Sequence, residues 1–227
     1  LTAGDSNHFN NAVGHMNEGD YLYVQYGLND SDPASFKVNL EKYYTAACDK
    51  GAKLIVVSPT DRHGRASWDS ESKEWIALAS GFASAAEEFV EEKIALGAEN
   101  IAYIDLNTAF IDWMNYTEQM ILEQRRNLGF SDTDVDTRAM DYYYLADRRS
   151  GVDTIHINDY GTDNAAYLVI QEAKQIVEAG KAENASASEK VQSAVLAELV
   201  ENMSDEQPCT VSNEIVKAGW PINSLYP

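Results

Sequence analysis

The stretch DYLYVQY at residues 20–26 is rich in aromatic and β-branched side chains and runs directly into Gly27. This composition, closed by a glycine, predicts a buried strand that ends in a tight turn. A second run of this kind is LIVV at residues 54–57, which is closed by Ser58 and Pro59. Short, continuous apolar runs are typical of strands that are covered on both faces, as in a parallel sheet.

Segments with helical spacing separate these strands. Apolar residues recur at helical intervals over residues 36–50, and Gly51 follows where a helix C-cap favours left-handed backbone. The same spacing over residues 74–96, which ends at Gly97, precedes the apolar run IAYIDL at residues 101–106. Alternating strands and helices with short connections predict the α/β class, with right-handed crossovers and helices on both faces of a parallel sheet.

The carboxyl ends of the strands are where such a sheet binds ligands. We therefore expect the functional site in the loops that follow Tyr26, Val57 and Leu106. Further along the chain, helical patterns cover residues 109–128, 163–179 and 190–203, and a linker of low hydrophobicity is predicted at 181–189. These patterns predict one domain over residues 1–180, followed by a linker and C-terminal extension over residues 181–227.

The charge and composition of the 227 residues exclude several classes of protein. A net charge of −20, from 37 acidic and 17 basic residues, would repel phosphate backbones and anionic lipid, so we expect neither nucleic acid nor membrane as a partner. No apolar run approaches the length that spans a bilayer. The cysteines are Cys48 and Cys209, which predict two unpaired thiols or one bridge but no disulfide framework.

The turn Gly27-Leu28-Asn29-Asp30 carries the first candidate chemistry. It directly follows a predicted buried strand, so the Asn29 amide would lie at the carboxyl edge of the sheet, where it can donate to an oxyanion. The alternative is a turn in which Asn29 and Asp30 bond only to nearby backbone.

The sequence Asp153-Thr154-Ile155-His156 carries the second candidate chemistry. Three-residue spacing allows the carboxylate to accept a hydrogen bond from one imidazole nitrogen while the other nitrogen faces a nucleophile. The alternative is a surface ion pair near the start of a helix.

Together, these two motifs resemble the SGNH hydrolase superfamily, also called GDSL-like. Gly27, Asn29 and Asp30 match its G-x-N-D block, and Asp153 with His156 match its D-x-x-H block. Within the superfamily, residues 9–176 resemble the rhamnogalacturonan acetylesterase-like branch, which the stretches at residues 19–21, 50–53 and 58–60 also resemble. The resemblance implies a flavodoxin-like, three-layer α/β/α fold, here without the family's first strands.

The resemblance also implies a reaction. A serine attacks an ester carbonyl, His156 accepts its proton, Asp153 orients the imidazole, and Asn29 with Gly27 forms part of the oxyanion hole. The implied activity is a serine carbohydrate esterase that removes acyl groups, with acetyl expected, from plant cell-wall polysaccharide without a cofactor. The implied setting is a secreted or cell-surface bacterial protein with other modules as possible partners. Further substrate contacts are expected from Asp30, Arg62 and His63.

The nucleophile is the open question in this pattern. Gly4-Asp5-Ser6 matches the family's first block, but Ser6 and Asn29 are 23 residues apart, and the family places a helix and a strand between the two blocks. Residues 9–20 already resemble the helix before the G-x-N-D block. We therefore expect the nucleophile upstream of Leu1 or on another polypeptide, with Ser6 as the alternative within the chain.

Two other motifs contain residue types that can bind metal ions. His8 and His15 lie seven apart on one helical face without a third ligand, and the acidic loop at residues 131–137 lacks the glycine and glutamate of an EF-hand, so no metal is predicted. Tyr142, Tyr143 and Tyr144 are candidates for stacking on sugar rings. Two other functions remain open: a catalytically silent SGNH-fold domain that binds glycan or has a structural role, and a flavodoxin-like ligand-binding domain.

Overall fold

The central sheet has the predicted parallel arrangement. The computed structural model describes residues 6–61, 67–69, 71–129 and 156–203. In it, β1 (Tyr21–Val24), β2 (Lys53–Val57) and β5 (Ile101–Ile104) lie side by side in the order β1-β2-β5, and both pairs are parallel. The three predicted strands are therefore confirmed, although the third ends at Ile104.

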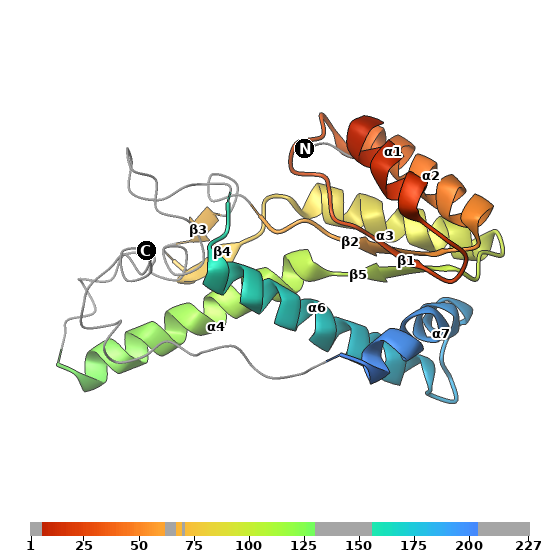
Figure 1. Ribbon diagram of the computed structural model, residues 1–227. Coiled ribbons are helices and arrows are strands. Elements are labelled where there is room, and N and C mark those ends of the chain that lie inside the picture. The colour runs from red at the N-terminus through yellow and green to blue at the C-terminus, as the bar shows by residue number, and fades with distance from the viewer. Residues whose placement is uncertain (1–5, 62–66, 70, 130–155, 204–227) are drawn as a thin grey trace. The chain divides into compact units, whose positions relative to one another are not determined.

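Helices cover both faces of this sheet (Figure 1). On one face α2 (Pro33–Lys50) and α3 (Ser80–Ala95) pack against each other, and α1 (Ser6–His15) lies beside α2. On the other face α7 (Ala187–Glu201) contacts β5. The predicted α/β class, with helices on both sides of the sheet, is confirmed.

The strands are buried on both faces. Leu54 and Val56 belong to the core beneath α2 and α3, while Ile55 and Val57 alternate with them on the opposite face and are also buried. The helices contribute large side chains to the first of these cores: Phe36, Leu40, Tyr43, Phe82 and Phe89. Burying one side chain of this size contributes about 1.5–3 kcal/mol. Burial on both faces explains why the sequence of β2 is continuously apolar.

The ends of α2 follow from local chemistry. Asp32 caps the helix because its Oδ1 accepts a hydrogen bond from the backbone N–H of Ser35 at 2.8 Å, and Pro33 occupies the first turn. At the other end Gly51 has φ +66°, and its N–H bonds to carbonyls of the last turn. The predicted stop at Gly51 is confirmed, and the helix starts three residues before Phe36 because of the cap.

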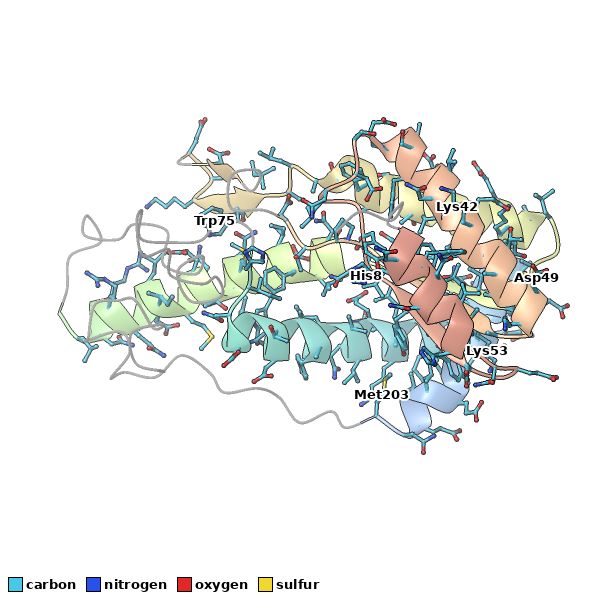
Figure 2. All side chains as sticks on the ribbon, turned by 45° about the horizontal axis from the view of Figure 1, so that its top comes forward. His8, Lys42, Asp49, Lys53, Trp75 and Met203 are labelled. Atoms are coloured by element: carbon cyan, nitrogen blue, oxygen red, sulfur yellow. The ribbon has the colours of Figure 1, made fainter. Side chains whose placement is uncertain are left out.

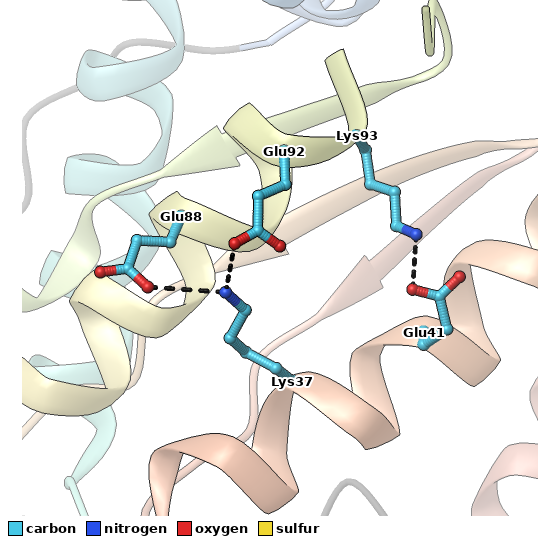
Figure 3. A network of polar contacts seen from close by, with 5 residues as sticks. All are labelled: Lys37, Glu41, Glu88, Glu92 and Lys93. Atoms are coloured by element: carbon cyan, nitrogen blue, oxygen red, sulfur yellow. Dashed lines mark hydrogen bonds and ion pairs between the residues drawn. The ribbon is translucent and has the colours of Figure 1, made fainter. Parts of the chain in front are cut away.

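Ion pairs join the exposed sides of α2 and α3 (Figure 3). Lys37 Nζ lies 2.8 Å from Glu92 and 3.5 Å from Glu88, and Lys93 Nζ lies 2.5 Å from Glu41. The bond to Glu92 is the main cause that raises the pKa of Lys37. Because most of these carboxylates are well exposed, each pair adds little beyond the apolar packing beneath it.

Side chains of α7 tie this helix to the edge and the start of the sheet. The Oε1 atom of Gln192 accepts a hydrogen bond from the backbone N–H of Tyr103 in β5, at 2.9 Å. At the start of the sheet, Lys53 Nζ donates to the Tyr21 hydroxyl at 2.7 Å, and that hydroxyl donates to Glu198 at 3.0 Å. The helix is therefore part of the packed α/β layers.

A short hairpin replaces the first part of one predicted helix. Residues 74–96 were expected to be helical, but β3 (Ser67–Asp69) and β4 (Glu74–Ile76) form an antiparallel pair, and α3 starts only at Ser80. Trp75 decides this outcome, because it is buried in β4 (Figure 2) and Asn115 of α4 (Leu106–Asn127) bonds to both its N–H and its carbonyl oxygen. Long-range packing thus overrides the helical spacing.

The last described helices meet at a tight junction. Both helices start earlier than predicted. The helix α6 (Asp159–Gly180) starts four residues before the predicted start at residue 163, and α7 starts at Ala187 rather than Lys190. The earlier start of α7 has a local cause, because Ser186 and Glu189 form a capping box. Its start shortens the predicted linker at 181–189.

The contacts divide the chain into two units. Unit 1 comprises residues 1–60, 79–107 and 169–205, and unit 2 comprises residues 61–78, 108–168 and 206–227. The domain boundary at residue 180 stays a prediction. Cys48 is exposed, whereas Cys209 lies outside the described residues, so both alternatives for this pair also stay predictions. No helix in the described ranges has the length and apolar character to cross a bilayer.

The junction of α6 and α7 predicts opposite effects of one substitution at two glycines. A Cβ added to Gly180 would overlap the Cβ of Ser193 and lie 2.5 Å from the Glu189 carbonyl oxygen, whereas no atom lies within 4 Å of one added to Gly14. We expect Gly180→Ala to lower the free energy of unfolding by about 1–3 kcal/mol through overpacking. Gly14→Ala should raise it by up to about 1 kcal/mol through helix propensity. Urea unfolding measures both, and equal effects would contradict this packing.

The Asp32 cap predicts a pH dependence. Hydrogen bonds from Ser35 and Ser31, with the backbone bond from Ser35 the largest cause, hold the pKa of Asp32 below its usual value. Its contribution is therefore present above the unfolded-state pKa and is lost as the pH falls through the folded-state pKa. We expect Asp32→Asn to lower the urea midpoint at neutral pH, with a difference that shrinks below about pH 4. Asp49→Asn, at an exposed position on the same helix, is the control and should show no such trend.

Candidate functional site

Polar residues gather where the three parallel strands end. The loops at residues 27–30 and 58–60 follow β1 and β2, and Asp105 with the start of α4 follows β5, so these segments share the carboxyl edge of the sheet in unit 1. Four of their polar side chains are buried, with exposed fractions between 0 and 8%: Asp30, Ser58, Thr60 and Asn107. Buried polar groups need hydrogen-bond partners, so these side chains are expected to hold the segments at this edge together.

The turn after β1 exposes one amide and buries one carboxylate. The backbone N–H of Asp30 donates to the Gly27 carbonyl oxygen at 3.1 Å and closes the turn, whose third residue, Asn29, is exposed. The Asp30 side chain is buried, and its Oδ1 accepts a hydrogen bond from Asn39 Nδ2 of α2 at 3.3 Å. The turn is thus held from the helix side while Asn29 remains accessible. Contact of Asp30 with substrate stays a prediction.

Gly27 cannot be replaced without strain at this turn. Its φ is +124°, which L-residues rarely adopt. A Cβ there would lie 3.2 Å from both Pro59 Cγ and Phe82 Cβ. The loop after β2 and the start of α3 therefore approach the Gly27 backbone closely, and only glycine leaves room for them.

The loops after β2 and β5 are linked by a cluster that the sequence did not reveal. The Ser58 hydroxyl donates to Asp105 Oδ1 at 3.0 Å and accepts from the backbone N–H of Asn107 at 2.8 Å. Asn107 Nδ2 also donates to the Pro59 carbonyl oxygen at 2.9 Å. The available signal was position alone, because Ser58 and Asn107 come directly after predicted strands and Asp105 lies near the end of one.

The predicted base, His156, is exposed and belongs to unit 2. It lies just before α6, whose first turn is capped by Asn158. The Oδ1 atom of Asn158 accepts a hydrogen bond from the N–H of Gly161 at 2.8 Å, and its carbonyl oxygen accepts from the N–H of Thr162, also at 2.8 Å. Its partner Asp153 lies outside the described residues, so their pairing stays a prediction.

Ser6 is the first residue of α1. Figure 1 shows α1 running antiparallel to β1, so the helix starts towards the carboxyl end of that strand. Ring contacts link α1 to the segment after β1 through α2. The ring centroid of Phe9 in α1 lies 5.1 Å from that of Tyr43 in α2, which lies 5.9 Å from that of Tyr26, just after β1. These contacts place α1 near Tyr26, which precedes the candidate turn, and the role of Ser6 as nucleophile stays a prediction.

The remaining candidates are only partly described. His8 (Figure 2) and His15 are exposed on α1. In the parts of the chain that the structure describes, no three His, Cys, Asp or Glu side chains come together as metal ligands. The other predicted residues lie outside the described ranges: Arg62, His63, the loop at residues 131–137, and Tyr142, Tyr143 and Tyr144.

Comparisons with known proteins bear on the fold. No family model matches the sequence, and no curated protein matches it. Among solved structures, the chain is similar to protein YxiM of Bacillus subtilis, with a TM-score of 0.55 and 21% identity over 77% of this chain. The match covers 43% of the YxiM chain, so this chain spans less than half of it. The likeness shows the fold, consistent with the flavodoxin-like arrangement that the SGNH resemblance implies, while the branch within that superfamily stays a prediction.

The close packing around Gly27 can be tested against a second glycine with positive φ. Gly19 has φ +84°, and no atom lies within 4 Å of an added Cβ. We expect Gly19→Ala to cost about 1 kcal/mol from backbone strain alone. Gly27→Ala should cost about 1–3 kcal/mol more, because the new methyl group meets Pro59 and Phe82. Urea unfolding compares the free energies of unfolding of the two variants. Equal losses would show that Pro59 and Phe82 leave room for a methyl group at Gly27.

Proposed function

We propose that this chain forms part of a serine esterase of the SGNH type. The single observation that carries the proposal is the exposed Asn29 on a glycine-closed turn at the carboxyl edge of a parallel sheet. An amide in this position is suited to bind a developing oxyanion. The Asp153-x-x-His156 motif, later in the chain, supplies the residue types that a base and its orienting group require.

The proposed reaction assigns one role to each residue. His156 accepts the proton of a serine hydroxyl as this attacks the ester carbonyl, and later donates a proton to the leaving alcohol. Asp153 accepts a hydrogen bond from the other ring nitrogen and stabilises the imidazolium. Asn29 Nδ2 and a backbone N–H donate to the carbonyl oxygen as it becomes negative. Water then hydrolyses the acyl-enzyme by the same proton transfers.

We propose an acylated polysaccharide, with acetyl as the acyl group, as the substrate. Rings on unit 2 support a sugar ligand: Trp113 lies 5.6 Å from Tyr116 and 5.9 Å from Tyr167, and Tyr116 is 53% exposed. Aromatic rings with an apolar face and a polar tip suit the C–H face and hydroxyls of a sugar. The charge of −20 disfavours strongly anionic glycans. Secretion or display on a bacterial surface is part of this proposal, since plant polysaccharide is extracellular.

The second candidate function is a silent SGNH-fold domain that binds glycan without hydrolysis. The observation that favours it is the short separation of Ser6 from Asn29, 23 residues, which departs from the family's spacing. In this alternative the same sheet edge binds the polysaccharide but no nucleophile attacks it. The two functions differ in one measurable property, which is turnover of an ester.

Hydrolysis of 4-nitrophenyl acetate and release of acetate from acetylated xylan test the esterase. We expect Asn29→Ala to lower kcat by about 10²–10³-fold, because one oxyanion donor is lost. His156→Ala should lower kcat further, because the base is lost. Matched controls with the same substitutions at exposed sites of α1 are Asn11→Ala and His15→Ala, which should retain the parent rate.

Ser6→Ala separates the two sources of the nucleophile. Loss of turnover and of labelling by a sulfonyl fluoride at residue 6 would assign the nucleophile to Ser6. Equal, nonzero rates for the parent and Ser6→Ala would eliminate it. If the parent has no turnover at all, Ser6 is eliminated as the nucleophile; sedimentation with acetylated xylan would then support the glycan-binding function, whereas turnover regained on adding the segment upstream of Leu1 would support the esterase.

A further inference from the structure

The Ser58–Asp105 cluster lies inside the candidate site but has no role in the proposed reaction. Ser58 is fully buried at the end of β2, and its hydroxyl hydrogen is committed to Asp105 at 3.0 Å. A hydroxyl has a single hydrogen to donate, so the acidic partner fixes its rotamer. The lone pairs of Ser58 Oγ then face the backbone N–H of Asn107, which donates to them at 2.8 Å.

Bonds to a charged acceptor are the strong members of such a cluster. Bonds that involve an ionised group are shorter and stronger than bonds between neutral groups. Asp105 also acts on its surroundings: burial, and then the negative charge of Asp105, raise the pKa of Tyr103. The Tyr103 phenol therefore keeps its proton.

The cluster holds Pro59 from both sides. Ser58 precedes Pro59 in the chain and is fixed by its backbone bond to the Ile104 carbonyl oxygen at 3.0 Å as well as by Asp105. On the other side, Asn107 Nδ2 donates to the Pro59 carbonyl oxygen at 2.9 Å. The ring of proline fixes the torsion about its N–Cα bond, so fixing the neighbouring backbone restricts where the ring lies.

The Pro59 ring in turn limits Gly27. Pro59 Cγ and Phe82 Cβ would each lie 3.2 Å from a Cβ on Gly27, so both approach this side of the Gly27 backbone closely. The Gly27 carbonyl oxygen closes the turn by accepting from the N–H of Asp30. Asn29 is carried by this turn. A continuous chain of contacts thus runs from Asp105 through Ser58 and Pro59 to the candidate oxyanion donor.

We propose that Asp105 is a positioning residue that, acting through Ser58 and Pro59, fixes the turn that carries Asn29. Its catalytic consequence rests on the proposed esterase function, but its effect on the turn does not. A displacement well below 1 Å at an oxyanion donor is enough to lower kcat, because donors must meet the oxyanion and not the ground-state carbonyl.

Two variants interrupt the chain of contacts at different points. Ser58→Ala removes the linking hydroxyl from a buried position with little change in volume, and Asp105→Ala removes the carboxylate. The control is Ser193→Ala, which removes a buried serine hydroxyl that donates to the Val177 carbonyl oxygen elsewhere in unit 1. Ser58→Ala removes both hydrogen bonds of the Ser58 hydroxyl, whereas Asp105→Ala and Ser193→Ala each remove one bond of a serine hydroxyl; only the first two interrupt the contacts that lead to Gly27.

The main measurement is the side-chain amide signal of Asn29 and the backbone amide signals of residues 28–30 in ¹H–¹⁵N NMR spectra. We expect Ser58→Ala and Asp105→Ala to shift these signals in the same direction, the double variant to shift them no further, and Ser193→Ala to leave them unchanged. If 4-nitrophenyl acetate is turned over, kcat should fall about tenfold or more in the first two variants with KM unchanged.

Unchanged Asn29 signals in a folded Ser58→Ala protein would overturn the proposal, as would shifts of equal size in Ser193→Ala. If Asp105→Ala does not fold, Ser58→Ala alone decides the result. A parent protein without turnover would count against esterase activity of this chain by itself, whereas the NMR comparison would still decide whether Asp105 positions the turn.

Discussion

The burial of β2 on both faces is the constraint from which the rest of the structure follows. Leu54, Ile55 and Val56 have no exposed surface, so this strand is enclosed by side chains from both helix layers and by a strand on each side. Its backbone groups have no access to water and are paired in the parallel ladders with β1 and β5. The ladders bring the ends of all three strands to one edge, where the chain must leave the sheet through polar loops.

Those loops are polar for two different reasons. Asn29 is exposed, whereas Asp30, Ser58 and Asn107 are buried and hold the segments at this edge together. The second group gives the edge its rigidity, because each buried polar atom that lacked a partner would cost about 1–3 kcal/mol. An exposed amide carried by a turn of this kind is held in place before any substrate arrives, which is the property that a catalytic hydrogen-bond donor needs.

The sequence predicts the sheet well because strands buried on both faces leave an unmistakable apolar run, and it predicts the end of α2 because Gly51 adopts a backbone that favours glycine. It fails at residues 74–76, since the strand there depends on Asn115 and Glu118, about 40 residues further along the chain. For the same reason the Ser58–Asp105 pair is invisible in the sequence: their contact depends on the register of β2 against β5, which no local pattern encodes.

One outer strand of the sheet, β5, is covered by α7. On β5, a backbone N–H that points away from β2 is taken by the Gln192 side chain of α7, which stands where a neighbouring strand would otherwise pair. Edge strands with unpaired amides are templates on which other chains add and aggregates grow. The helix α7 and its Gln192 side chain therefore cover this border of the sheet, where another strand would otherwise add.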